Sequence, residues 1–244
     1  VPVEWTHYLG AQQSYLLYHP TLYLRYQHDY HWKFSLYSGL DRQAGQALDL
    51  CPYLRRTDYR TLTSTAGLMP LSTTATGQLY AEYKNTVNEF FATLTLTNSH
   101  GRHATMDEQY LSEDTLSLTR RALKNRTDTW TLKTSLSQGI FDWRHKASLD
   151  LQLTRHYGHQ LTRTDASPAL LQDYRYDLLT AEPKLNWSPL TWLEADYHAT
   201  LSYNATHIGS DTQLPPLLNL TQRLRLILTI GRIDVQLSGE HYRN

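Results

Sequence analysis

Histidine is the residue type in this chain that most invites a search for chemistry. There are 12 histidines in 244 residues, and three pairs have an i, i+3 spacing: His28/His31, His100/His103 and His156/His159. Imidazole is a common ligand of zinc, copper, nickel and haem iron. In a strand, however, residues three apart point to opposite faces, and no cysteine or clustered carboxylate completes a ligand set. We therefore expect no metal site and no cofactor, with metal capture in a long loop as the less favoured alternative.

A second candidate for chemistry is a nucleophile with a base. Asp196, His198 and Ser202 share one polar face of a predicted strand. Residues two apart on a strand are separated by about 7 Å, which is too far for a direct hydrogen bond without help from a neighbouring strand. A hydrated wall explains such a row more simply. We expect no catalytic residues and no enzymatic activity, and a barrel enzyme is the weakest of the alternatives.

The element that must position these residues is the stretch 190–206. Its odd positions from Leu193 to Ala205 are all apolar, and its even positions from Glu194 to Asn204 are all polar. Successive side chains of a strand point to opposite faces, so this is one strand with an apolar and a polar face. Fourteen residues tilted by about 45° rise roughly 32 Å, close to the hydrocarbon thickness of a bilayer. The pattern therefore predicts a membrane strand with its apolar face toward lipid and its polar face toward a wet lumen.

The same alternation recurs along the chain as five hairpins. The predicted strand pairs are 15–27 with 32–36, 78–84 with 90–96, 130–140 with 147–153, 173–187 with 190–206, and 220–228 with 233–237. Long polar connections at 41–76, 98–127, 157–171 and 208–216 alternate with short turns such as 141–144 and 187–189. We expect an all-β fold, an antiparallel transmembrane β-barrel that is partial, with roughly 10–12 long strands in successive hairpins. Ten is favoured, and twelve would follow if the strand-like pieces 59–65 and 116–118 also crossed the membrane.

Two sets of residues follow from this alternation. The predicted lumen-lining residues are Glu194, Asp196, His198, Thr200, Ser202, Asn204, Asp150, Gln152 and Thr154. The predicted lipid-facing residues are Leu193, Tyr197, Leu201, Tyr203, Leu149, Leu151 and Leu153.

Composition narrows the function classes. Lys plus Arg and Asp plus Glu both number 23, and a zero net charge argues against a nucleic-acid partner. The mean hydropathy is −0.54 and no apolar run of about 20 residues exists, which excludes a helical membrane bundle. A mixture of 18 Tyr, 6 Trp and 4 Phe suits a boundary between water and an apolar phase, although a sandwich with tyrosines on its faces would also explain it. Cys51 is the single cysteine, so no disulfide can form within the chain.

The two ends of the sequence indicate a part of something longer. The first ten residues have neither the basic start nor the apolar core of a signal peptide. At the other end, the strand pattern of 233–244 simply stops. We therefore expect residues 1–244 to form a single β-barrel segment of a larger barrel, with no plug domain.

The hairpin series resembles the C-terminal part of the barrel of TonB-dependent outer-membrane receptors. The resemblance is carried by the segments 72–96, 127–153, 187–192 and 237–244, which contain strand and turn signatures and no chemical motif. It implies a nutrient transporter of the bacterial cell outer membrane, with a polar lumen and extracellular loops for substrate uptake. It also implies a barrel of 22 strands in contact with outer-membrane lipid, a plug domain, a TonB-type energising protein and room for a surface lipoprotein partner. The last strand here runs upward, whereas the barrels of the family close with a downward strand. The same pattern of strands and turns is typical of porins.

A different class of protein is the main alternative. A surface-exposed or secreted β-sandwich or solenoid, used for adhesion or glycan binding, could carry tyrosine-rich sheet faces. Strand length separates the two hypotheses, because regular strands of about 12 or more residues favour the membrane and strands of about 5–7 residues favour a sandwich.

Overall fold

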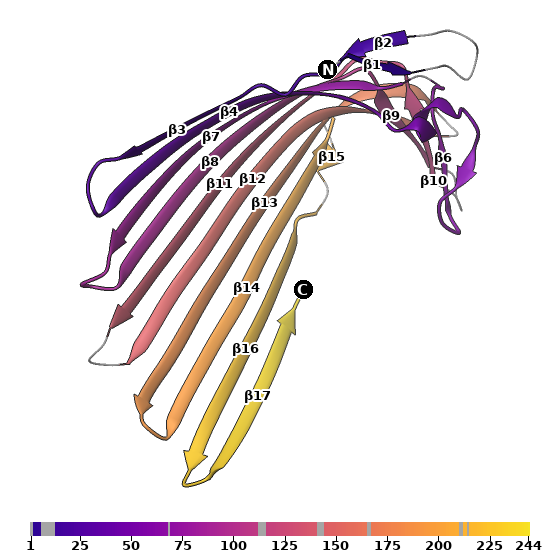
Figure 1. The fold of residues 1–244 in the computed structure, drawn as a ribbon. Helices are drawn as coiled ribbons and strands as arrows, with labels where there is room; N and C mark the ends of the chain where they lie inside the picture. The colour runs from indigo at the N-terminus through magenta and orange to yellow at the C-terminus, as the bar shows by residue number, and fades with distance from the viewer. Residues whose placement is uncertain are drawn as a thin grey trace.

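The protein is all-β, and its body is one broad antiparallel sheet (Figure 1). The computed structural model describes residues 2–5, 13–67, 69–111, 116–140, 144–164, 167–209, 212–213 and 215–244. The main series of this sheet consists of ten strands, each hydrogen-bonded to the next, in the order β3, β4, β7, β8, β11, β12, β13, β14, β16, β17. This order confirms the pairing of the five predicted hairpins and the favoured number of ten. The first predicted strand, 15–27, is wrong in extent, because its strand in this sheet begins at Thr21 and residues 13–16 pair with residues 2–5 instead. Within the described residues the sheet is not closed, because β3 and β17 each have a neighbour on one side only.

The strands between the two edges are long. They contain 13 to 24 residues, compared with about 5–6 in a typical soluble domain. Their bounds, with those of the two edge strands, are β3 (Thr21–Gln27), β4 (Trp32–Ala44), β7 (Leu71–Asn85), β8 (Phe90–His103), β11 (Asn125–Ile140), β12 (His145–Thr164), β13 (Ser167–Leu190), β14 (Leu193–Ile208), β16 (Leu217–Ile230) and β17 (Ile233–Arg243). Outside this run, β1 (Pro2–Trp5) pairs with β2 (Gln13–Leu16), and β15 (Thr212–Gln213) pairs with β14.

Several predicted loops are wrong in extent, because the strands continue into them. The segment 157–171 is strand on both sides of residues 165–166, since β12 reaches Thr164 and β13 begins at Ser167. Likewise the connection after β4 begins only after Ala44, and the one after β8 begins only after His103. At these strand ends both faces carry polar residues, so the alternation that marks a strand in the sequence is lost.

The turn of the fourth hairpin was also placed wrongly by sequence. β13 passes through Pro189 to Leu190, and the turn lies at 191–192. The pairing of β13 with β14 shifts register between Trp187 and Leu190 and is interrupted at Glu182 and Pro183. Proline has no N–H to donate to a neighbouring strand, which explains the interruption at Pro183. The predicted turn at 141–144 lies outside the described residues except for Arg144.

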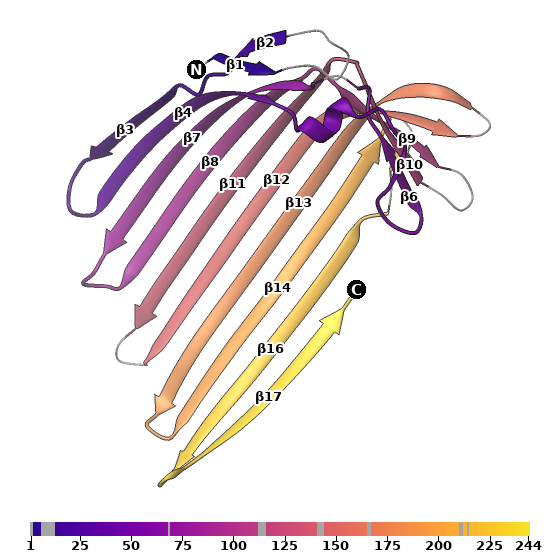
Figure 2. The same cartoon turned by 45° about the vertical axis from the view of Figure 1, so that its right-hand side comes forward.

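Two long connections fold together into a second layer, which we call the annex (residues 45–70 and 104–124; Figure 2). It contains η1 (Ala47–Leu50), β5 (Arg55–Arg56), β6 (Thr61–Ser64), β9 (Met106–Leu111) and β10 (Leu116–Arg121). β6 runs parallel to β10, β10 is antiparallel to β9, and β9 runs parallel to the end of β12. The pieces predicted at 59–65 and 116–118 are therefore strands of the annex and not additional strands of the main series.

Few apolar residues of the described chain are buried, and two of them, Met69 and Met106, belong to the annex. Met69, Met106 and Leu161 are 8%, 5% and 9% exposed, and the other buried apolar residues of the described chain are two alanines. Arg120 lies 2.8 Å from Asp49 and 3.2 Å from Asp107, so one guanidinium joins both connections. These contacts make the annex an ordered layer rather than two independent loops.

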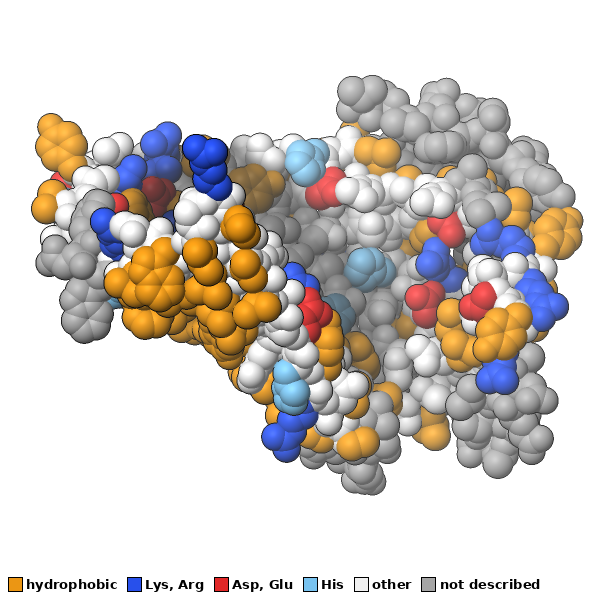
Figure 3. Space-filling model, turned by 90° about the horizontal axis from the view of Figure 1, so that it is seen from below, with side chains coloured by type: hydrophobic (Ala, Val, Ile, Leu, Met, Phe, Trp, Pro, Cys, Tyr) orange, Lys and Arg blue, Asp and Glu red, His pale blue; other side chains and the backbone are white. Residues whose placement is uncertain are grey.

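The main sheet has one apolar and one polar face. Directly opposed residues form a row across nine strands on the apolar face: Leu24, Leu36, Leu79, Leu96, Leu132, Leu153, Leu179, Tyr203 and Leu218. Leu24, Leu79 and Leu218 are more than half exposed, and among the described residues no large side chain is fully buried. Figure 3 shows the hydrophobic side chains gathered on one side of the sheet, whereas polar and charged side chains surround the hollow behind it. No helix in the described part of the chain is long and apolar enough to cross a membrane.

Candidate functional site: the polar face of the sheet

The nine residues predicted to line a lumen lie on one face of the sheet, in β12 and β14, which both pair with β13. Gln152 of β12 is opposite Thr180 of β13, which is opposite Ser202 of β14. Directly opposed residues of paired strands point to the same side, so β12 and β14 present one continuous polar surface. The predicted lipid-facing residues alternate with these and occupy the other face.

The middle of the polar face holds a cluster of alternating charges. Lys184 Nζ lies 3.0 Å from Asp150 Oδ2 and 3.5 Å from Glu182 Oε2. His198 Nε2 lies 3.8 Å from Glu182, and the Ser135 hydroxyl donates to Asp150 at 2.6 Å. One lysine is thus shared between two carboxylates. These side chains are between a third and a half exposed, so each pair contributes about 1 kcal/mol or less to stability.

A second cluster of charged and polar side chains follows on β13, β14, β16 and β17. Arg225 Nε donates to Asp196 Oδ2 at 2.8 Å, and Asn186 donates to Glu194 at 3.1 Å. On the neighbouring pair of strands, Arg223 forms an ion pair with Glu240. The two clusters border a hollow of about 580 Å³ on the polar face, whose lining includes Lys184, Asp196, His198, Arg223, Arg225 and Glu240. Side chains that donate and accept hydrogen bonds thus line a water-accessible surface with little net charge.

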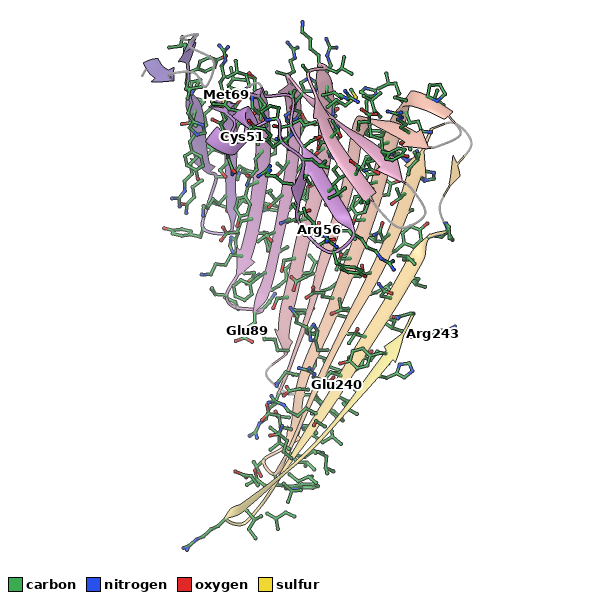
Figure 4. All side chains as sticks on the ribbon, turned by 90° about the vertical axis from the view of Figure 1, so that its right-hand side faces the viewer. Cys51, Arg56, Met69, Glu89, Glu240 and Arg243 are labelled. Atoms are coloured by element: carbon green, nitrogen blue, oxygen red, sulfur yellow. The ribbon has the colours of Figure 1, made fainter. Side chains whose placement is uncertain are left out.

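The annex covers the end of the polar face that lies away from the short turns. A hollow of about 620 Å³ lies between the strand residues Gln43, Ser72 and Thr127 and the annex residues Asp49 and Arg120. In Figure 4, Arg56 marks the far end of the annex, well below the labelled Cys51 and Met69. The annex therefore narrows the space in front of the polar face. Sequence reasoning identified two of its strands but not their pairing.

The histidine pairs do not form ligand sets. His103 Nε2 lies 3.1 Å from the Thr127 hydroxyl on the polar face, and burial lowers the pKa of His103. His156 Nδ1 lies 2.7 Å from the Thr129 hydroxyl, whereas His159 Nδ1 lies 2.8 Å from Asp173 Oδ1 on the opposite face. Of the described residues, no three His, Cys, Asp or Glu side chains are grouped so that they could hold a metal ion.

The remaining pair lies in a short turn. His28 Nδ1 is 3.1 Å from the Tyr26 hydroxyl, and the His31 ring stacks on Tyr83 with 5.9 Å between ring centroids. Both contacts are those of histidines at a strand end. Neither contact brings another metal-ligating side chain to the ring of His28 or His31.

The candidate catalytic row is not assembled either. Asp196 is engaged by Arg225 and Asn186, and the carboxylate nearest His198 is Glu182. In the described structure no hydrogen bond joins Ser202 to His198. A nucleophile needs an adjacent base that is itself oriented by a third group, and these three residues do not provide that arrangement.

Sequence reasoning missed one feature of the opposite face. Beyond the apolar residues, on the side of the annex, that face carries arginines at positions 42, 102, 126, 155 and 175. Their signal is visible in the sequence, because each lies an even number of residues from an apolar residue of its strand.

No protein-family model, curated protein or solved structure matches this chain.

Proposed function

We propose that this chain forms part of the wall of a bacterial outer-membrane β-barrel, of the kind found in TonB-dependent nutrient receptors. The observation that carries the proposal is the row of exposed or half-buried apolar residues across nine paired strands, with no second layer over it in the described structure. Monomeric soluble proteins rarely expose contiguous apolar patches of more than a few hundred Å². Paired strands with an apolar outer face satisfy their backbone groups and can lie in lipid.

The apolar residues of the outer face form a band across the strands, and the tilt of this apolar band supports a barrel wall. On β4 the band ends at Trp32, four residues from Leu36, whereas on β16 it ends at Ile230, twelve residues from Leu218. This difference of eight residues corresponds to about 26 Å along the strands, while the seven steps from β4 to β16 cover about 34 Å. A membrane boundary drawn through both ends gives a strand tilt of about 38°, within the range of about 35–45° for outer-membrane barrels. The strands in Figure 1 step down in the same sense from β3 to β17.

The height of the band also fits. On β14 every outer-face residue from Leu193 to Ala205 is apolar, which is about 40 Å along the strand. At the tilt derived above, this length spans about 31 Å, close to the hydrocarbon thickness of about 30 Å of a bilayer.

Aromatic rings mark the border of the band near the short turns. Trp32, Tyr83 and Phe90 contact one another on β4, β7 and β8, with ring centroids 4.9 Å and 5.9 Å apart. Trp187 continues this border on β13 and is 43% exposed, and Trp130 lies at the opposite border and is 45% exposed. Tryptophan and tyrosine favour the interface between hydrocarbon and water, so the rings are placed as in an aromatic girdle.

In this proposal the chain acts as a passive wall. The polar face lines the lumen and offers hydrogen bonds to a passing solute, and the annex narrows the entrance. A plug and an energising partner, which the resemblance to TonB-dependent receptors implies, would gate passage. The transport role and the TonB-dependent type rest on the strand and turn signatures together with the polar lumen face.

The proposal is tested by expressing the full-length protein with a secretion signal in a Gram-negative host and fractionating the cells. We expect it in the outer-membrane fraction, resistant to an alkaline wash and extracted only by detergent. Recovery in the soluble fraction without detergent would refute the membrane assignment and favour the adhesin-like alternative.

A further inference from the structure

Three tyrosines lie close together on the polar face, in the strands at the β3 edge of the sheet (Figure 1). Tyr23 of β3 is directly opposite Tyr37 of β4. Tyr80 of β7 lies on the same face and is diagonal to Tyr37, whose directly opposed neighbour on β7 is Gln78. Directly opposed side chains are about 5 Å apart and diagonal neighbours about 7–8 Å apart, so one ligand can contact all three rings. We call these three residues the tyrosine cluster.

A barrel wall does not by itself explain the tyrosine cluster. Each of the three residues is next in sequence to a leucine of the apolar row, at position 24, 36 or 79. The cluster is therefore level with the apolar band and not at its borders, where tyrosine favours the interface between hydrocarbon and water. It also lies on the face that points away from lipid. Tyr23 is 60% exposed, so a largely apolar ring is left in water, where a ligand can reach it.

A glycine allows the central ring to lean along its strand. Gly39 is two residues from Tyr37 in β4 and shares its face. A Cβ atom added at Gly39 would lie 2.5 Å from the Tyr37 hydroxyl oxygen and 3.0 Å from the ring carbon Cζ. The hydroxyl end of the ring therefore lies over the backbone of Gly39, in space that any other residue type would fill. A ring that leans in this way offers its flank to a ligand in front of the polar face.

Polar side chains that donate and accept hydrogen bonds surround the tyrosine cluster. Glu82 Oε2 accepts hydrogen bonds from the Tyr80 hydroxyl at 2.9 Å and from Lys33 Nζ at 3.2 Å. Arg25 of β3 lies on the same face, directly opposite Ser35, and is exposed. Lys33 and Arg25 would repel a cationic ligand, and Glu82 would repel an anionic one. The surroundings of the rings therefore favour a neutral ligand that can both donate and accept hydrogen bonds.

The polar face continues from the tyrosine cluster into a hollow. Thr95 of β8 is directly opposite Tyr80. It lines a hollow of about 350 Å³, whose other polar lining residues include Thr93, Lys133, Asp150 and Gln152. These side chains again combine donors with acceptors. A ligand longer than one ring can therefore extend from the cluster along this surface.

We propose that the tyrosine cluster binds a neutral oligosaccharide, with one sugar ring on the tyrosines and the following rings toward the hollow. A pyranose ring has a face of C–H groups, which packs against an aromatic ring, and a rim of hydroxyl groups, which donate and accept hydrogen bonds. Aromatic side chains with a few placed polar groups are the usual lining of sites for small ligands. The inference rests on the proposed function, because it names the class of solute that the lumen of the proposed barrel receives.

The test is saturation-transfer NMR on the full-length protein in nanodiscs, with maltohexaose, cellohexaose and xylohexaose as neutral oligosaccharides. Hexa-alanine and hexaglutamate serve as a neutral peptide and an anion, and empty nanodiscs serve as the blank. Tyr37→Leu and Tyr80→Leu each remove a ring but keep an apolar side chain, whereas Tyr37→Phe keeps the ring. The matched control is Tyr242→Leu, because Tyr242 of β17 also donates a hydrogen bond to a glutamate two residues away.

We expect at least one of the three oligosaccharides to bind, with the strongest saturation transfer to its ring C–H protons, and neither peptide to bind. Each ring removed from the cluster should weaken binding by about 2- to 12-fold. Tyr37→Phe and Tyr242→Leu should leave the affinity unchanged.

The outcomes separate this inference from the proposed function. If the protein inserts but binds none of the oligosaccharides, or if Tyr242→Leu weakens binding as much as Tyr37→Leu does, the inference is wrong while the proposed function stands. Equal binding of hexa-alanine or hexaglutamate would also overturn the inference. If the protein stays soluble without detergent and binds an oligosaccharide through the tyrosine cluster, the site stands and the proposed function is wrong. If the protein neither inserts nor binds, both are overturned.

Discussion

The sharpest consequence of a two-faced wall concerns adjacent residues of β12. Leu151 lies on the apolar face near the middle of the band, because the apolar positions of its strand run from Ala147 to Leu153. Its opposed neighbours are Thr134 and Ala181, so an arginine at this position would find no carboxylate. Gln152, the next residue, lies on the polar face. Leu151→Arg and Gln152→Arg therefore introduce the same charge one residue apart, on opposite faces.

The expected magnitudes differ strongly. An arginine on the lipid face costs about 2–4 kcal/mol at the bilayer midplane and about 0–1 kcal/mol near the interface. We therefore expect Leu151→Arg to lower the folding equilibrium by about 30- to 700-fold. Leu153→Arg, beside the border residue Arg155, should cost about 1 kcal/mol or less. Gln152→Arg should change stability by no more than about 0.5 kcal/mol, because its side chain reaches water.

The assay is reversible unfolding by guanidinium chloride in the presence of lipid vesicles, followed by tryptophan fluorescence. Two outcomes would refute the reasoning. Equal costs for the substitutions at 151 and 152 would mean that the faces are not different environments. Equal and large costs at 151 and 153 would mean that a protein layer covers the apolar face, since a bilayer makes the cost depend on depth.

Three further predictions concern the annex and a short turn. Glu108 is 3% exposed and pairs with Arg121, so Arg121→Ala should leave a buried carboxylate unpaired and destabilise the annex by about 1–3 kcal/mol. This loss should appear as faster amide exchange in β9. An unchanged exchange rate, or an equal effect of Arg60→Ala at the exposed tip of the annex, would contradict the prediction. Burial lowers the pKa of His103, next to the charged neighbours Asp107 and His156, so the folded state binds this proton less readily than the unfolded state. Stability should therefore be full above about pH 6.5 and fall on acidification. His103→Gln should flatten this pH dependence, measured by amide exchange in the annex. Asp29 accepts hydrogen bonds from the backbone N–H groups of Trp32 and His31 at 2.6 Å and 2.8 Å, and these bonds lower the pKa of Asp29. Asp29→Ala should therefore speed amide exchange in the β3–β4 turn, whereas Asp29→Asn should keep the acceptor and the protection. Equal protection in both variants would count against this role of Asp29.

The part of the fold that sequence predicted is the part where one face is apolar. β14 is recognisable because its odd positions from Leu193 to Ala205 are all apolar, and the same period two identifies the other hairpins. The pattern fails where strands leave the band. The segment predicted as a loop at 157–171 contains Gly158 and Pro168, residue types that are typical of loops. Gly158 nevertheless lies inside β12, and Pro168 stands at the start of β13, where a missing N–H is tolerated.

The annex could not be predicted from a local pattern. β6 and β10 are short, and they pair in parallel although Thr61 and Leu116 are 55 residues apart in the chain. Their pairing joins two connections that are far apart in the chain, and no local periodicity records such a pairing. The alternation in β12 and β14 did predict the residues of the polar face, whereas the ion pairs across that face, such as Lys184 with Asp150, required the register between strands.

The environment of consecutive residues on β14 tests the central claim most directly. Single cysteines are introduced from position 199 to position 204 in a Cys51→Ser background, and the protein is reconstituted in vesicles. We predict a strict period of two: cysteines at 200, 202 and 204 react with a membrane-impermeant thiol reagent, and a fluorophore at 199, 201 or 203 is quenched by a lipid-phase quencher. Uniform reactivity with the aqueous reagent, or absence of lipid-phase quenching at the odd positions, would contradict the membrane wall.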